Sequence, residues 1–423
     1  MGSEEVKKKD SNMAPETAQD GSSAETENQK RNDGDDQKKG KKKNKRRGNF
    51  LTRRLSCLRL DDEVPTVDEP TGGGGFNLQA EDRSPTHLVV MVNGIIGSAE
   101  NWKYAAKQFV KAYPHDVLVH CSEANYAFLT FDGVDVMGNR LAEEVLSVVQ
   151  KHSNLQKISF IGHSLGGLVI RYAIAKLYEP DFSRKSDGED GENKCEGPNS
   201  LSEDKLNGKI AGLEPINFIT SATPHLGSRG HKQVPVFCGS HALEKVASRA
   251  AGILGRTGKH LFLTDKDDGK PPLLLQMVND TEELPFISAL QSFKRRVAYA
   301  NVRFDHLVGW STSSLRYRNE LPKRRNLLKN EKYPHIVHIE SAKATISPEE
   351  NSSESVKVKR SKTSNMEETM LRNLTKLSWE RVDVSFSGSI QRFFAHNTIQ
   401  VQTHLTNSAG KDVIQHTVDK FLL

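Results

Sequence analysis

One short segment holds residue types suited to nucleophilic catalysis. Ser164 lies in the sequence Gly-His-Ser-Leu-Gly, a Gly-x-Ser-x-Gly pattern that begins at Gly162 and ends at Gly166. A serine flanked by glycines at this spacing suits a sharp turn that exposes the hydroxyl and leaves no bulky neighbour. A Gly-rich turn without chemistry is the alternative interpretation, so the flanking sequence must decide.

The flanking sequence favours a nucleophile elbow. Residues 157–161, KISFI, are rich in apolar and β-branched side chains and predict a buried strand. Residues 165–178, LGGLVIRYAIAKLY, predict a helix with few charges. Strand, tight turn and helix form the setting in which such a serine acts as a nucleophile. The amino end of the helix would then direct its free N–H groups at developing negative charge.

A serine hydroxyl needs a base within hydrogen-bond reach, and the base needs an orienting carboxylate. In proteins with such a nucleophile elbow, the acid and then the histidine follow the serine in the chain, each in a loop after a later strand. Asp305 follows the predicted strand 297–302, and His396 follows the predicted strand 379–386. The competing residues are less well placed: Asp265, Asp267, Asp268, Asp383, His404 and His416.

An oxyanion needs two backbone donors. The N–H of Leu165, the residue after the nucleophile, is the first expected donor, and the N–H of Ile95 is the second. Gly94 and Gly97 would let this loop approach the substrate closely. The role of the Asn93 side chain stays open.

The surrounding elements predict an α/β-hydrolase fold, with a mostly parallel central sheet and helices on both faces. Strands are expected at 87–92, 117–121 and 216–220, and helices at 102–112 and 140–152. Alternation of strands and helices on this scale implies parallel pairing. A final helix is expected at 412–422.

The predicted organisation is a tail at 1–83, with a Gly linker, and one hydrolase domain at 84–423. The domain carries inserts at 181–207, 229–287 and 341–371. The first and third are Ser-rich and charged, so disorder is expected there. The second lies beyond the end of a strand, so it is a lid candidate.

The lid candidate contains a dense apolar run. Its residues expected to line an acyl site or contact a membrane are Leu273, Leu274, Leu275 and Met277. Packing of this run on the main core is the alternative.

Composition excludes several classes of protein. The four cysteines lack any C-x-x-C pair, which argues against a zinc site or a disulfide framework, and no metal or nucleotide motif occurs. No apolar run of 18 residues indicates a transmembrane helix, and the amino terminus lacks an apolar signal sequence. The tail carries ten Lys or Arg residues and no acid at 38–54. Contact with an anionic membrane is slightly favoured for this run over a nuclear-localisation signal or RNA contact, and a solvated tail is the plain alternative.

Several sequence blocks together resemble the lipase-like serine-esterase family of the α/β-hydrolase superfamily, described in plants and fungi. They are VNGIIGSAENW, TFDGVDVMGNRLAEEV, GHSLGGLVIRYA, GRTGKHLFLTDKDDGKPPLLLQM, TSATPHLGS, NVRFDHLVGW and FAHNTIQV. The resemblance covers residues 85–423. It implies a triad of Ser164, Asp305 and His396 and an acyl-ester substrate, with a lipid favoured.

The sequence therefore predicts a serine hydrolase that cleaves carboxylic esters through an acyl-enzyme intermediate. The alternatives are hydrolysis of acyl-thioesters or acyl-proteins, and a non-catalytic ligand-binding protein of the same fold. We expect no cofactor, a lipid or other acyl-ester substrate, and no specific nucleic-acid partner. The expected location is the cytoplasm, with peripheral membrane contact, and the nucleus is the alternative that the basic tail suggests.

Overall fold

The computed structural model describes residues 57–58, 84–181, 208–228, 254–265, 269–342 and 362–423. All of them belong to one compact unit, Arg54–Leu423. The basic run at 38–54, the insert at 182–207 and residues 229–253 lie outside the described residues. The expectations for them therefore stay predictions.

The core of the fold is an eight-stranded sheet in the described chain, ordered β1-β3-β2-β4-β7-β8-β10-β9. The six strands from β3 to β10 pair in parallel, and β1 and β9 join the two edges antiparallel. Its strands are β1 (Cys57–Leu58), β2 (His87–Val92), β3 (Val117–Cys121), β4 (Lys157–His163), β7 (Glu214–Ser221), β8 (Arg295–Asn301), β9 (Ile336–Glu340) and β10 (Glu380–Val384). A separate antiparallel pair consists of β5 (Tyr178–Glu179) and β6 (Lys209–Ile210).

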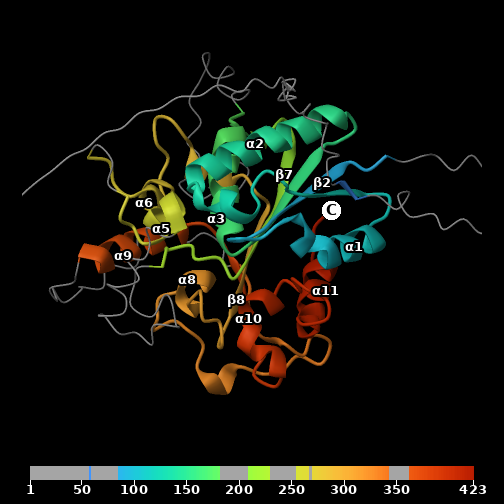
Figure 1. The fold of residues 1–423 in the computed structure, drawn as a ribbon, viewed down its shortest axis with the longest axis vertical. Coiled ribbons are helices and arrows are strands. Elements are labelled where there is room, and N and C mark those ends of the chain that lie inside the picture. Colours follow the sequence, from blue (N-terminus) through green and yellow to red (C-terminus); the bar gives the residue numbers. More distant parts are fainter. Residues whose placement is uncertain (1–56, 59–83, 182–207, 229–253, 266–268, 343–361) are drawn as a thin grey trace, which may run out of the picture. The chain divides into compact units, whose positions relative to one another are not determined.

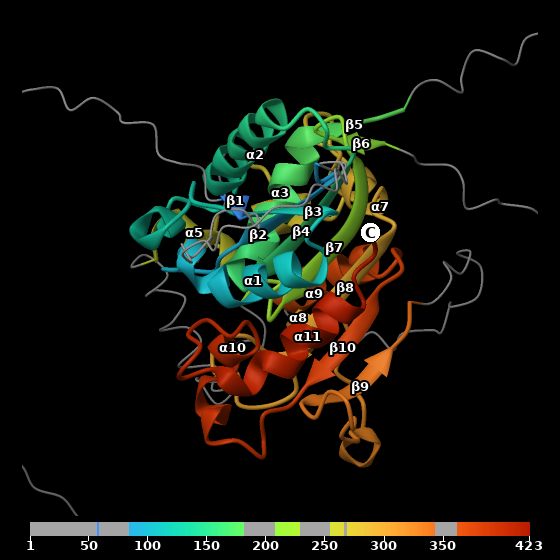
Figure 2. The ribbon, with the colours of Figure 1, turned by 90° about the vertical axis from the view of Figure 1, so that its right-hand side faces the viewer.

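Helices cover both faces of this sheet (Figures 1 and 2). The α-helices are α1 (Lys103–Ala112), α2 (Val134–Lys151), α3 (Leu165–Leu177), α5 (Gly255–Leu261), α6 (Leu273–Gln276), α7 (Phe286–Gln291), α8 (Trp310–Ser314), α9 (Lys362–Leu374), α10 (Ala395–Thr398) and α11 (Lys411–Asp419). Short 3-10 helices are η2 (Ala99–Trp102), η3 (Ala127–Phe131), η6 (Arg324–Asn326), η7 (Ile390–Phe394) and η8 (Ser408–Gly410).

The sheet separates two hydrophobic cores because side chains alternate along each strand. Leu88 and Val90 of β2 pack with α2 and α3 on one face. Val89 and Met91 of the same strand pack with α1 and α11 on the other face. Burial on both faces explains why the strand is an unbroken apolar run, as central parallel strands usually are. The expected α/β-hydrolase architecture, with a mostly parallel sheet covered on both faces, is confirmed.

Three expectations about elements need correction. The amphipathic helix predicted at 140–152 begins six residues earlier, at Val134. The third insert does not lack structure throughout, because α9 occupies its last part and buries Met370 and Leu371 in the core. The tail is not wholly without structure either, since Cys57 and Leu58 pair with β3. None of the described helices is both long and apolar enough to cross a membrane.

Candidate active site

Ser164 lies at the sharp turn between β4 and α3. Its backbone has φ 52° and ψ −124°, a conformation that costs a non-glycine residue energy and that clusters at functional sites. The Ser164 N–H donates to the Ser221 carbonyl of β7 at 2.8 Å, so sheet pairing holds the strained residue in place. The strand-turn-helix context expected from the sequence is therefore present.

Close backbone packing explains the glycines of this turn. A Cβ at Gly166 would collide with the carbonyl oxygen of Val92, and one at Gly162 would lie 2.7 Å from the Gly167 nitrogen. At Gly94 an added Cβ would lie only 2.9 Å from the Ser164 Cβ. Gly97 meets a neighbour in its own loop, because its Cβ would lie 2.8 Å from Asn101 Oδ1. These glycines let the elbow and the loop after β2 approach each other.

The structure brings Ser164, His396 and Asp305 into one hydrogen-bonded chain. The Ser164 hydroxyl lies 2.9 Å from His396 Nε2, and His396 Nδ1 lies 3.0 Å from Asp305 Oδ2. Asp305 follows β8 and His396 lies in α10, so the three residues come from loops at the carboxyl edge of the sheet. All three side chains are buried. This arrangement lets the imidazole accept the hydroxyl proton while the carboxylate orients the ring.

Asp305 lies in a site that favours its charged form. Burial alone would raise the pKa of this carboxyl, but the His396 imidazole, the Asn301 amide and the Val308 N–H together hold the pKa below its ordinary value. The Leu307 and Val308 N–H groups donate to Oδ1 at 3.0 and 2.8 Å. An ionised carboxylate at this position can stabilise a protonated imidazole.

Two further side chains fix the His396 segment, and the sequence patterns did not single out either role. His163 Nε2 donates to the His396 carbonyl at 2.7 Å, and the two rings lie 4.8 Å apart. Asn301 Nδ2 donates both to Asp305 Oδ2 at 2.9 Å and to the Ala395 carbonyl at 3.2 Å. The only available signals were their positions, beside the nucleophile and at the end of a strand.

Burial keeps His163 neutral. Burial is the largest cause that lowers the pKa of this imidazole, and the nearby His396 also lowers it. The hydrogen bond to the His396 carbonyl and the Asp305 carboxylate oppose the shift, and the resulting pKa is about 3. A neutral ring next to His396 avoids repulsion when His396 takes up a proton.

The expected oxyanion donors are the N–H groups of Ile95, in the loop after β2, and of Leu165, at the start of α3. Within the described part of the chain, neither the Ile95 N–H nor the Leu165 N–H donates a hydrogen bond. The Ile96 N–H donates to Thr130 Oγ1 at 2.9 Å, which anchors the loop. Asn93 Nδ2 donates to the carbonyls of Gly94 and Asn125, both at 3.0 Å. The Asn93 side chain, whose role the sequence left open, thus shapes this loop.

The competing acids and bases have other partners. Asp383 is fully buried, and its carboxylate accepts from Arg316, Trp310 and His338. His416 is hydrogen-bonded to the Tyr299 hydroxyl at 2.9 Å, and the exposed His404 packs against Tyr104. Asp265 accepts from the Leu273 N–H. Asp267 and Asp268 lie outside the described residues.

The apolar run at 273–278 packs into the core. Leu274 and Met277 are buried, and Leu273 and Leu275 are partly buried against the same cluster. Arg171 Nη2 donates to the Met277 carbonyl at 2.8 Å, which ties the run to α3. Burial argues against direct membrane contact by Leu274 and Met277, and the expectation that the four residues line an acyl site stays a prediction. Their packing is the alternative that the sequence left open.

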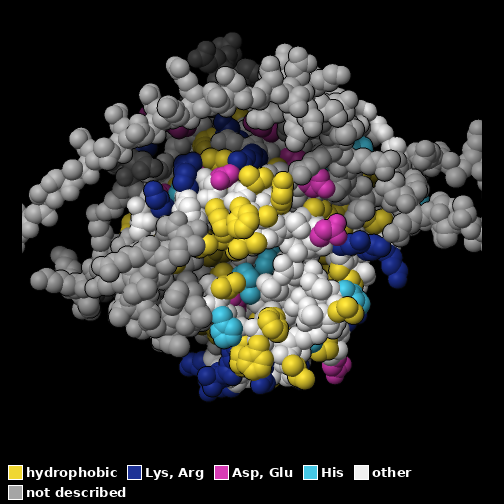
Figure 3. All heavy atoms as spheres, viewed as in Figure 1, with side chains coloured by type: hydrophobic (Ala, Val, Ile, Leu, Met, Phe, Trp, Pro, Cys, Tyr) yellow, Lys and Arg dark blue, Asp and Glu magenta, His cyan; other side chains and the backbone are white. Residues whose placement is uncertain are grey.

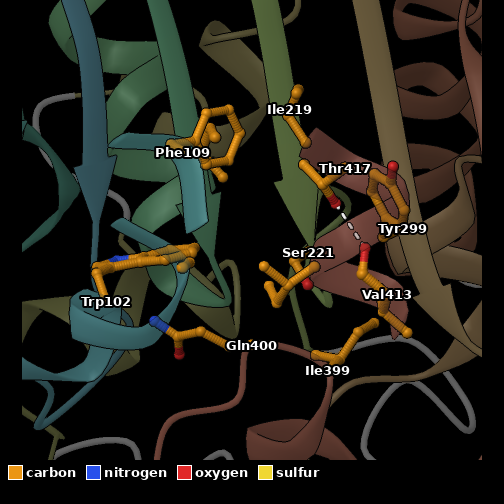
Figure 4. A pocket seen from close by; sticks show the side chains of 12 residues that line it. Trp102, Phe109, Ile219, Ser221, Tyr299, Ile399, Gln400, Val413 and Thr417 are labelled. Carbon is orange, nitrogen blue, oxygen red and sulfur yellow. Dashed lines mark hydrogen bonds between the residues drawn. The ribbon is translucent and has the colours of Figure 1, made fainter. Parts of the chain in front are cut away.

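A small apolar cavity lies behind the elbow, between the sheet and the helices α1 and α11 (Figure 4). Trp102, Phe109 and Ile219 contribute to its lining, and the Thr417 hydroxyl donates to the Val413 carbonyl at its border. The lining residue Ser221 adjoins the site, because its carbonyl accepts from the Ser164 N–H. The cavity is a packing feature of the α1–α11 layer.

The chain is similar in sequence to several curated fungal proteins. The chain is 32% identical over 286 residues to putative lipase ROG1 of Saccharomyces cerevisiae, covering 64% of this chain and 36% of that protein. It is 28% identical over 242 residues to putative lipase C4A8.10 of Schizosaccharomyces pombe, covering 54% of this chain and 26% of that protein. The chain thus spans about a third of the length of the curated relatives it matches.

Among solved structures, the Bacillus licheniformis lipase BlEst2 in its propeptide form is similar with a TM-score of 0.31 and 15% identity, covering 53% of this chain and 37% of that chain. The lin2722 gene product of Listeria innocua gives a TM-score of 0.29 and 11% identity, covering 55% and 78%. Similarity of this degree supports no inference about function. The family model described as "Putative serine esterase (DUF676)" matches residues 82–315, more than half of the 423 residues. The chain therefore belongs to this putative serine esterase family.

Proposed function

We propose that the protein is a serine hydrolase that cleaves carboxylic esters, with lipid acyl esters as its substrates, through a covalent acyl-enzyme. The observation that carries the proposal is the buried chain of hydrogen bonds from Ser164 through His396 to Asp305. Membership in a serine-esterase family and the lipase names of the yeast relatives support the same chemistry.

In the first half-reaction, Ser164 Oγ attacks the ester carbonyl while His396 Nε2 takes the hydroxyl proton. Asp305 stabilises the imidazolium through Nδ1, and the N–H groups of Leu165 and Ile95 receive the oxyanion. His396 then gives its proton to the leaving alcohol, and the acyl group stays on Ser164.

In the second half-reaction, His396 removes a proton from water, and the resulting nucleophile attacks the acyl carbonyl. The acid leaves and Ser164 regains its proton. The carbonyl contacts from His163 and Asn301 keep the imidazole in position through both proton transfers.

Labelling with a fluorophosphonate probe tests the proposal. The parent protein should label, and Ser164→Ala should neither label nor hydrolyse an ester while remaining folded. Ser387→Ala is the matched control, because this exposed serine lies outside the site and its hydroxyl bonds to that of Ser385. Labelling of Ser164→Ala at the parent level would refute the nucleophile.

The substrate class needs a separate comparison. Long-chain glycerolipid esters should be hydrolysed with a higher kcat/KM than acyl-thioesters of the same chain length. A preference for the thioester would favour the acyl-thioesterase alternative. A folded parent protein that neither labels nor hydrolyses any of these substrates would favour a non-catalytic binding protein.

A further inference from the structure

Exposed hydrophobic side chains gather on one edge of the sheet. Eight large hydrophobic side chains of the described residues are at least half exposed, and one of them, Leu328, lies in the loop that precedes the antiparallel edge strand β9. Six of them form what we call the apolar rim: Ile96, Phe128, Leu307, Ile390, Phe394 and Leu405. Single exposed apolar residues are ordinary in soluble proteins, but a group on one face marks an interaction surface.

The apolar rim belongs to the loops that carry the site. Ile96 lies beside the expected oxyanion donor, Leu307 lies two residues after Asp305, and Phe394 lies two residues before His396. Its two most exposed members are Ile390, 89% exposed, and Leu405, 86% exposed. Ile390 and Leu405 therefore leave little of their surface packed.

Hydrogen bonds join four of the rim's segments in two pairs. The Ala127 N–H donates to the Gly97 carbonyl at 3.0 Å, which ties the Phe128 segment to the Ile96 loop. Gln391 bonds through its side chain to Ser408 and to the Ala409 N–H, which ties the Ile390 segment to the loop after Leu405. The apolar side chains are thus held in place rather than carried on independent loops.

Basic side chains border the rim. Lys323, Arg324 and Arg325 are exposed in the loop of residues 323–329, called the basic loop below. Lys329 Nζ lies 3.8 Å from the position of a Cβ at Gly388, so this loop adjoins η7. Figure 3 shows hydrophobic side chains on both sides of a group of histidines on this face, with Lys and Arg side chains at its lower border. Exposed apolar side chains beside cationic ones are complementary to a membrane surface, which has an apolar interior below anionic headgroups.

We propose that the apolar rim and the basic loop form a docking surface for an anionic phospholipid bilayer. The inference rests on the proposed ester hydrolysis, because docking through this face would bring the loops next to the triad against the lipid. A second copy of the chain bound to the same face would bring two basic loops together, and their like charges would repel. An anionic bilayer would bury the apolar side chains of the rim and pair its headgroups with the cations of the basic loop.

Vesicle sedimentation tests the surface separately from catalysis. The full chain carries Ser164→Ala, so the vesicles are not degraded, and it is mixed with phosphatidylcholine vesicles with or without phosphatidylserine. Ile390→Ser/Leu405→Ser should weaken binding to both vesicle types about tenfold or more, because two apolar side chains no longer insert. Arg324→Glu/Arg325→Glu should weaken binding about tenfold to the anionic vesicles alone.

Two double variants at residues outside the apolar rim and the basic loop serve as matched controls. Leu146→Ser/Leu423→Ser removes two apolar side chains that are 42% and 45% exposed, and Lys151→Glu/Lys209→Glu reverses two exposed charges. Neither double variant should change binding by more than about twofold. The basic tail is present in every variant, and raising the salt concentration screens its contribution equally.

The outcomes separate the two proposals. If the rim variant binds as well as its parent, or if the parent binds neither vesicle, the docking surface is wrong. If the parent is a dimer in sedimentation velocity and the rim variant is a monomer, the occupant is a second copy and the bilayer proposal is wrong. If vesicle binding depends on the rim but Ser164 does not react with the fluorophosphonate, the proposed hydrolysis fails and the surface stands.

Discussion

The nucleophile and the base of the candidate site are held by different physical means. Ser164 is fixed by the backbone, because strand pairing to Ser221 and the tight glycine contacts leave the turn little freedom. His396 lies in a four-residue helix that follows the short 3-10 helix η7, and side chains from distant strands hold the carbonyls of Ala395 and His396. The family match, which ends at residue 315, includes the turn that carries Ser164 and not the helix that carries His396.

This difference has a physical consequence. A sharp turn that requires glycines at a fixed spacing can be recognised from a few consecutive residues, whereas the placement of His396 depends on hydrogen bonds from residues that no local pattern relates. Substitutions at the elbow should therefore affect the nucleophile itself. Substitutions of Asn301 or His163 should leave Ser164 intact and displace the base.

The largest expected effect is loss of the nucleophile. Ser164→Ala should lower kcat by about 10⁴-fold or more, and His396→Ala should have a similar effect, because triad members act as a unit. The double variant should be little worse than either single variant. The measurement is single-turnover hydrolysis of a short soluble ester. If the two losses instead multiplied, the two side chains would act independently and the triad assignment would be wrong.

The next largest effect separates two buried carboxylates. Asp305→Asn should lower kcat about a thousandfold or more, because the imidazole loses its orienting acceptor. Asp383→Asn should instead weaken the ion pair with Arg316 and lower the free energy of unfolding by about 3 kcal/mol, with most activity per folded molecule retained. Urea denaturation and activity of the folded fraction separate the two results. If Asp383→Asn were folded and as inactive as Asp305→Asn, the acid would be misassigned.

A smaller effect is expected where a side chain only positions the base. Asn301→Ala removes the donor shared by Asp305 and the Ala395 carbonyl. It should lower kcat about tenfold to a hundredfold with little change in KM, because displacement of the base affects the transition state more than substrate binding. Fluorophosphonate labelling of Ser164 should slow in parallel. A rise in KM at constant kcat would instead place Asn301 in substrate binding.

The buried His163 predicts a pH dependence of stability. Its pKa is about 3 in the folded protein and 6.5 ordinarily, so the unfolded chain binds more protons between these values. The free energy of unfolding should therefore rise with pH in this window, and His163 should contribute at most about 1.4 kcal/mol per pH unit. His163→Gln, which keeps an N–H donor, should give a shallower slope in urea titrations from pH 4 to 7. An unchanged slope would mean that His163 does not titrate on unfolding.

Local patterns in the sequence predicted most of the sheet and the strand-turn-helix setting of Ser164. The strands at 87–92 and 117–121 have the predicted bounds, because unbroken apolar runs are what doubly covered parallel strands require. The predicted order of serine, acid and base selected three residues that the fold brings together. These features depend on composition and chain order, which a single sequence displays.

The features that the sequence did not predict depend on distant contacts. The strand β9 is short and pairs antiparallel with β10 only after a long excursion. The helix α9 is polar along most of its length and is held by a few buried residues such as Met370 and Leu374. Packing of this one narrow face against the core stabilises such a polar helix. The carbonyl contacts of His163 and Asn301 likewise join residues that no local pattern relates.

The smallest expected effect concerns the apolar run at 273–278, where neighbouring leucines differ in burial. Leu274 is fully buried, so Leu274→Ala should lower the free energy of unfolding by about 2 kcal/mol or more and reduce the yield of folded enzyme equally for every substrate. Leu275 is only partly buried, so Leu275→Ser should cost less than about 1 kcal/mol. Hydrolysis of a long-chain lipid ester and of a short soluble ester by Leu275→Ser then tests the remaining lid hypothesis. A loss of about threefold or more on the long-chain ester alone would place Leu275 at the acyl chain. Equal rates on both esters would leave the whole run a structural part of the core, because packing against α3 and α9 would then account for all of its apolar residues.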